Sequence, residues 1–118
     1  MDLLLATSTL AALSQSTRLE TFRLLVRHVP DGLPAGEIAR QLDIPQNTMS
    51  AHLAVLTRAG LASAERQSRS IIYRADLNRL RELTLYLVKD CCGGNADLCA
   101  PLIAELSNPC CLAEGVRA

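Results

Sequence analysis

Residues 33–74 constrain the fold most, because two short amphipathic helices separated by a proline break are predicted there. Pro34 suits the first turn of the first helix, where its missing N–H is not needed. Pro45 ends that helix, since it disfavours helical angles at Ile44. Gly60 follows the second helix, where a left-handed cap is expected. The apolar positions at helical spacing are Ile38, Ala39 and Leu42 in the first helix and Met49, Leu53 and Leu56 in the second. This pattern predicts a helix-turn-helix.

The outward face of the second helix is polar and has the chemistry to read DNA in a major groove. Amides that can bond adenine edges, hydroxyls that can bond bases or phosphates, and a small residue that permits close approach lie there: Gln46, Asn47, Thr48, Ser50 and Ala51. A solvated helix face carries similar residues, so this face alone leaves DNA binding open. His52 also has a structural alternative, in which it bonds backbone or phosphate.

Two strand-like runs follow, residues 61–65 and 70–74, joined by the polar tip Arg66-Gln67-Ser68-Arg69. Such a hairpin is typical of a wing that contacts the phosphate backbone or a minor groove. The net charge of the chain is zero, but residues 40–74 contain five arginines against two acidic residues. The predicted DNA-contacting residues are Gln46, Asn47, Thr48, Ser50, Ala51, His52, Arg58, Arg66, Arg69 and Tyr73.

Part of this region matches a known pattern. The matching residues are Met49-Ser50-Ala51-His52-Leu53, then Leu56, Ala59-Gly60-Leu61, Arg66 and Tyr73-Arg74. With them, the sequence from about Thr9 to Leu87 resembles the ArsR/SmtB family of winged-helix repressors. The resemblance implies a homodimer that binds operator DNA and releases it when a metal or metalloid binds. Pro45 departs from the pattern, because many members of the family have a serine helix cap there.

The expected fold is mainly α with a small β-hairpin. It is a winged helix-turn-helix of four helices, two strands and a fifth helix, followed by a short C-terminal helix, and it is homodimeric. Residues 1–90 are expected to form the DNA-binding and dimerisation domain, and residues 91–118 a cysteine-rich metalloid-binding segment.

The helices outside the central stretch are predicted from caps and apolar stripes. Residues 2–14 form the first helix, and Thr17-x-x-Glu20 predicts a capping box for the second, which ends near Val29. Asp76 is expected to cap the last long helix, and residues 98–106 to form the short one. The expected core stripes are Leu3, Ala6, Leu10 and Leu13 in the first helix and Leu19, Phe22, Val26 and Val29 in the second.

The apolar stripe of the last long helix is wider than one domain needs. We therefore predict that this helix and the first helix form a dimer interface, with a wholly intramolecular core as the alternative. The predicted interface residues are Leu3, Leu10, Leu80, Leu83 and Leu87.

All five cysteines follow residue 90: Cys91, Cys92, Cys99, Cys110 and Cys111. No signal peptide and no transmembrane stretch is predicted, so a cytoplasmic protein with reduced thiols is expected. Soft thiolates select thiophilic ions. Trivalent arsenic takes three thiolates, and Cys91, Cys92 and Cys99 are close enough in sequence for one site. The run 91–99 also resembles the C-terminal metalloid site of one ArsR subgroup, which implies arsenite, or antimonite, as the effector.

Other uses of the thiols remain open at this point. Cys110-Cys111 could complete a four-thiolate site for zinc or cadmium, which is the main alternative. Thiol oxidation is another way to gate the repressor. An enzyme is not expected, because the sequence has no Gly-rich phosphate loop and no Ser/His/Asp arrangement. Reactive thiols favour helix N-termini, whereas Cys91-Cys92 is predicted to end a helix.

Overall fold

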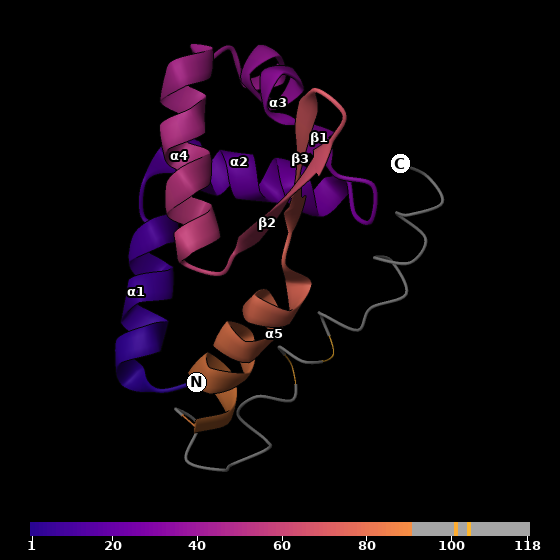
Figure 1. Cartoon of the computed structure of the whole chain (residues 1–118). Helices are drawn as coiled ribbons and strands as arrows, with labels where there is room; N and C mark the ends of the chain where they lie inside the picture. The colour runs from indigo at the N-terminus through magenta and orange to yellow at the C-terminus, as the bar shows by residue number, and fades with distance from the viewer. Residues whose placement is uncertain (91–100, 102–103, 105–118) are drawn as a thin grey trace. The chain divides into compact units, whose positions relative to one another are not determined.

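The computed structural model describes residues 1–90, Pro101 and Ala104 (Figure 1). The chain forms two compact units, Met1–Leu83 and Thr84–Ala118. A π-helical turn, Tyr86–Asp90, follows the last α-helix. The elements are α1 (Leu3–Leu13), α2 (Ser16–Arg27), β1 (Leu33–Pro34), α3 (Ala35–Leu42), α4 (Gln46–Arg58), β2 (Ala62–Gln67), β3 (Ser70–Ala75) and α5 (Leu77–Leu85). All five cysteines lie outside the described residues, as does most of the helix predicted over residues 98–106.

The core of the first unit forms where α2 packs against α4 and β3 (Figure 1). Its largest side chains with no exposed surface are Leu25, Ile38, Met49, Leu53, Leu56 and Leu61. The inner face predicted for α4 is therefore confirmed, and so are Ile38 and Ala39 of α3. The predicted fold class, a mainly helical winged helix-turn-helix, is confirmed as well.

The wing is larger than the predicted hairpin. Strands β1, β3 and β2 form an antiparallel sheet in that order, with Leu33 opposite Tyr73. The placement of Pro34 in the first turn of α3 was wrong, because Pro34 is extended at φ −67° and ψ 150° and belongs to β1. A proline is tolerated there because β1 is an edge strand. The tip is also shorter than predicted: Arg66 and Gln67 belong to β2, which leaves a turn of Ser68 and Arg69.

The predicted faces of the two N-terminal helices were partly wrong. In α1 the buried residues are Ala6, Thr9 and Ala12, while Leu3 is 66% exposed. The buried Thr9 hydroxyl donates to the Leu5 carbonyl at 2.7 Å, which makes its burial tolerable. In α2 the buried residues are Thr21, Phe22, Leu24 and Leu25, whereas Leu19 and Val29 are exposed.

The start of α2 also differs from the predicted capping box. Gln15, rather than Thr17, is the N-cap, and its Oε1 accepts a hydrogen bond from the Arg18 N–H at 2.8 Å. The Arg18 Nε atom in turn donates to the Ala12 carbonyl at 2.7 Å. These contacts join the end of α1 to the start of α2.

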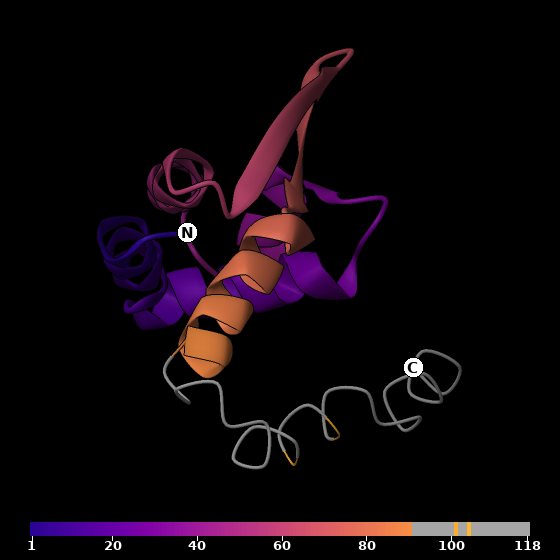
Figure 2. The same cartoon turned by 90° about the horizontal axis from the view of Figure 1, so that it is seen from below.

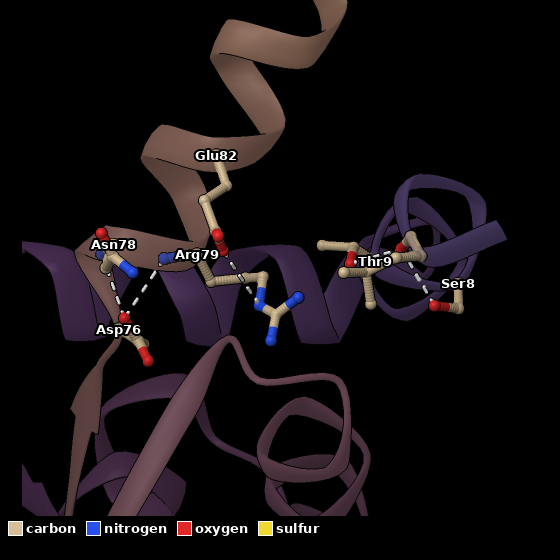
Figure 3. Close-up of polar contacts among 7 residues, drawn as sticks. Ser8, Thr9, Asp76, Asn78, Arg79 and Glu82 are labelled. Atoms are coloured by element: carbon tan, nitrogen blue, oxygen red, sulfur yellow. Dashed lines mark hydrogen bonds and ion pairs between the residues drawn. The ribbon is translucent and has the colours of Figure 1, made fainter. Parts of the chain in front are cut away.

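Two predicted helix boundaries are confirmed. Gly60 has φ +79°, the left-handed conformation expected after α4. Asp76 caps α5: its Oδ1 accepts from the N–H groups of Asn78 at 3.0 Å and Arg79 at 3.2 Å (Figure 3). Among the described residues, no helix is long and apolar enough to cross a bilayer.

Candidate nucleic-acid interface

The two faces of α4 differ sharply. Met49, Leu53 and Leu56 have no exposed surface. The opposite face is polar, and its exposed residues are Gln46, Asn47, Thr48, Ser50, Ala51 and Arg58. His52 is half-buried at the edge of this face. The helix is thus fixed by its apolar side and presents the side that was predicted to read bases.

The turn before α4 sets where its N-terminus begins. Asp43 ends α3 in the left-handed conformation, φ +55°, and the Ile44 N–H donates to the Ala39 carbonyl at 3.0 Å. Pro45 is the N-cap of α4 and makes no side-chain capping bond, as its chemistry requires. Inside the first turn, Asn47 Oδ1 accepts from the Thr48 N–H at 2.9 Å.

A charged cluster on α3 lies beside this turn. The guanidinium of Arg40 and the amide of Gln41 both donate to the Glu37 carboxylate, the amide at 2.8 Å. The hydrogen bond from Arg40, followed by that from Gln41, lowers the pKa of Glu37 from 4.5 to about 2. Arg40 is therefore neutralised by an acid on its own helix, although it counts toward the basic zone in the sequence.

The hairpin β2–β3 projects beyond the helices, next to α4 (Figure 2). Arg66 lies opposite Ile71, and Arg69 lies in the turn itself. Both arginines are exposed, and within the described part of the chain neither forms an ion pair. Tyr73 is half-buried in the central strand and packs against the core. Its contact with DNA stays a prediction.

Arg74 is the other arginine of the basic zone that has an acidic partner. Its Nη1 atom is 2.6 Å from Glu65 Oε1. With Arg40 and Arg74 paired, the basic zone retains three arginines without an ion pair among the described residues, Arg58, Arg66 and Arg69. One lies at the end of α4 and two lie on the wing, so the unpaired arginines of this zone lie on the two elements predicted to contact DNA.

The comparisons with known proteins agree with this geometry. Residues 13–63 match a family model described as a helix-turn-helix domain. An ArsR-like transcriptional regulator from Rhodococcus sp. RHA1 is 26% identical with a TM-score of 0.63, over 86% of this chain and 92% of that one. A possible transcriptional regulator for arsenical resistance is 26% identical with a TM-score of 0.61, over 68% of this chain and 80% of that one.

A third solved structure is the homodimeric winged helix-turn-helix DNA-binding domain of Mb0332 from Mycobacterium bovis, a possible ArsR-family transcriptional regulator. It is 26% identical with a TM-score of 0.60, over 71% of this chain and 76% of that one. No curated protein matches the sequence. The chain has the winged helix-turn-helix fold that these ArsR-like regulators share.

The predicted dimer residues fall into two groups. Leu3, Leu10 and Leu87 are 66%, 40% and 41% exposed in the single chain, which is expected of residues that a dimer partner would cover. Leu80 is half-buried against the core, and Leu83 is only 4% exposed. These two side chains already pack within the chain, so a substitution there would act on folding first.

The predicted metalloid ligands Cys91, Cys92 and Cys99 lie outside the described residues, and their role stays a prediction. In the part of the chain that the structure describes, no group of three His, Cys, Asp or Glu side chains could hold a metal ion.

The sequence did not reveal two contacts around the helix-turn-helix. One is the Glu65–Arg74 pair, which depends on the register of the hairpin: the two-residue turn at 68–69 places both side chains on one face. The other is at Gly60, where an added Cβ would lie 2.8 Å from the Nε atom of Arg79. Arg79 thus covers the C-terminal end of α4, where a cation is favoured by the helix dipole, and its Nε is 3.8 Å from Glu82 Oε1 (Figure 3).

Proposed function

We propose that this protein is an ArsR-type transcriptional repressor that binds operator DNA as a dimer. It leaves the DNA when trivalent arsenic, or antimony, binds its C-terminal thiolates. The observation that carries the DNA part is the exposed polar face of α4, beside a wing whose Arg66 and Arg69 have no ion pair among the described residues. In this role α4 enters the major groove, and the wing contacts phosphates or the minor groove.

The composition and exposure of α1 support the dimer. The helix contains no charged residue, yet Leu3, Leu4 and Leu10 are 66%, 79% and 40% exposed. A helix that is apolar around most of its circumference is normally buried. A second copy of the chain would cover this surface, as in the homodimeric Mb0332 domain, and would set two α4 helices at the spacing of two operator half-sites.

The dimer can be tested at a position that does not belong to the core. Leu10→Asp should give a monomer in sedimentation at micromolar concentration and abolish operator binding, because one half-site alone binds weakly. Leu80→Asp would be ambiguous, since Leu80 packs against the core. A Leu10→Asp protein that sediments as a dimer would place the interface elsewhere.

The thiol chemistry of the C-terminal segment supports arsenic as the effector. Cys91, Cys92 and Cys99 supply three soft ligands within a short run, without histidine. The similar protein described as a possible regulator for arsenical resistance agrees with this choice. The second candidate is control by zinc or cadmium, or by thiol oxidation, and it is favoured by Cys110-Cys111, which would bring a site to four thiolates.

One binding assay separates these effectors. An operator is first selected from a random duplex library with the full-length protein under reducing conditions. Arsenite, zinc and cadmium are then titrated separately into the complex. We expect release by arsenite. Release by zinc or cadmium alone, or only after the reductant is removed, would favour the second candidate.

Substitution of the thiols identifies the ligands. Cys91→Ser, Cys92→Ser and Cys99→Ser should each keep operator binding and blunt the release by arsenite. The double variant Cys110→Ser/Cys111→Ser is the matched control and should respond normally. A control that fails to respond, together with a normal response of Cys99→Ser, would show that the third ligand is wrongly assigned.

A further inference from the structure

We infer that Arg74 is a positioning residue of the wing, which holds the Glu65 carboxylate away from the arginines that contact DNA. This inference rests on the proposed DNA binding. Arg74 Nη1 donates to Glu65 Oε1 at 2.6 Å, and Arg74 Nε donates to the Pro30 carbonyl at 2.9 Å. One guanidinium therefore joins β2 to the turn between α2 and β1.

The register of the hairpin explains how the two side chains meet. Ser63 lies opposite Arg74, and Glu65 lies opposite Ile72. Glu65 and Arg74 are thus diagonal neighbours on one face of the hairpin, within reach of long side chains. Arg66, the next residue along β2, points to the other face.

The turn between α2 and β1 restricts Arg74 to this position. A Cβ added at Gly32 would be 2.7 Å from Arg74 Cγ and 2.6 Å from the Tyr73 carbonyl oxygen, so the turn lies directly against β3. The Arg74 side chain is only 28% exposed, whereas that of Glu65 is 57% exposed. Arg74 is anchored by its bond to the Pro30 carbonyl, and it holds the more exposed Glu65.

The charges of the wing show what this contact achieves. Residues 62–75 contain three arginines and one glutamate. While Arg74 holds Glu65, the positive charge of Arg66 and Arg69 is uncompensated. Without Arg74, the Glu65 carboxylate could pair with a wing arginine or repel the phosphates, and either would reduce the counterion release that drives DNA binding. The Gln67 amide, 3.4 Å from the same Glu65 oxygen, carries no charge to replace that of Arg74.

The test compares Arg74→Gln, Glu65→Gln and the double variant with the full-length wild type. Affinity for a random-sequence duplex is measured at several salt concentrations. Arg74→Gln should weaken binding about fivefold to tenfold at low salt, and the salt slope should fall by about one per subunit. The double variant should return to within about twofold of the wild type, because the liberated carboxylate is gone. Arg23→Gln is the matched control for net charge. Arg23 is an exposed residue of α2, so this variant should bind normally.

Two results would overturn the inference. A double variant as weak as Arg74→Gln would mean that the liberated Glu65 carboxylate is not the cause, and that Arg74 acts by touching DNA or through its bond to the Pro30 carbonyl. An Arg74→Gln protein that binds like the wild type would mean that the pair has no role. Loss of folding cannot imitate the expected result, since the double variant also lacks the bond to Pro30 and would not recover. Failure of the wild type to bind any duplex is a separate outcome, which would overturn the proposed function.

Discussion

Helix α4 and the wing β2–β3 lie next to each other (Figure 2), but they are held in place differently. The inner residues of α4, Met49, Leu53 and Leu56, have no exposed surface. In the hairpin the only buried side chains are the two alanines at its base, Ala62 and Ala75. Burial therefore fixes the element that is predicted to read bases, whereas strand hydrogen bonds and the Arg74 contacts fix the element that is predicted to contact phosphates.

The largest effect expected from this difference is on stability. Leu53→Ala should lower the free energy of unfolding by about 2–5 kcal/mol, because it leaves a cavity in the core. Ile71→Ala, on the wing and 37% exposed, should cost less than about 1 kcal/mol. Urea unfolding at one protein concentration measures both. Equal losses would mean that the wing belongs to the same cooperative core as α4.

The same difference explains which features the sequence could predict. Met49, Leu53 and Leu56 define one helical face without a competing apolar set, so the inner face of α4 was predicted correctly. In α2, apolar residues at 19, 22, 24, 25 and 26 fit two overlapping faces. The folded core buries the face with Thr21, whose hydroxyl lies 3.6 Å from the Met49 sulfur.

Features that depend on distant contacts escaped the sequence. Strand β1 is two residues long and is defined by its pairing with β3, so it has no periodicity of its own. The Glu65–Arg74 pair follows from hairpin register, which in turn follows from a turn shorter than the predicted tip. DNA and metalloid contacts stay predictions, because they require partners.

A second prediction separates the two elements by what they read. Gln46→Ala or Asn47→Ala should cost roughly 1–3 kcal/mol on the selected operator and little on random DNA, since base contacts carry specificity. Arg69→Ala should instead weaken binding to all sequences and lower the salt slope by about one per subunit. Competition between operator and random duplexes at several salt concentrations measures both. Equal losses on both duplexes for all three variants would contradict this division.

The smallest expected effect concerns the polar surface of α3, beside the start of α4. The hydrogen bond from Arg40 to Glu37 lowers the pKa of Glu37 from 4.5 to about 2 in the folded protein. Because the folded pKa lies below the ordinary value, the contribution of Glu37 to stability is fully present above pH 4.5. It is lost as the pH falls from 4.5 toward 2.

Glu37→Gln should therefore flatten the fall in stability between pH 4.5 and pH 2, and leave the slope above that range unchanged. Arg40→Gln removes the first cause of the lowered pKa and should flatten the same window while keeping the carboxyl. Thermal unfolding across this pH range is the measurement. The effect is expected to be far smaller than that of Leu53→Ala, because exposed ion pairs contribute little. Parallel curves for the wild type and Glu37→Gln would show that the contacts of Glu37 with Arg40 and Gln41 contribute nothing to stability in this pH range.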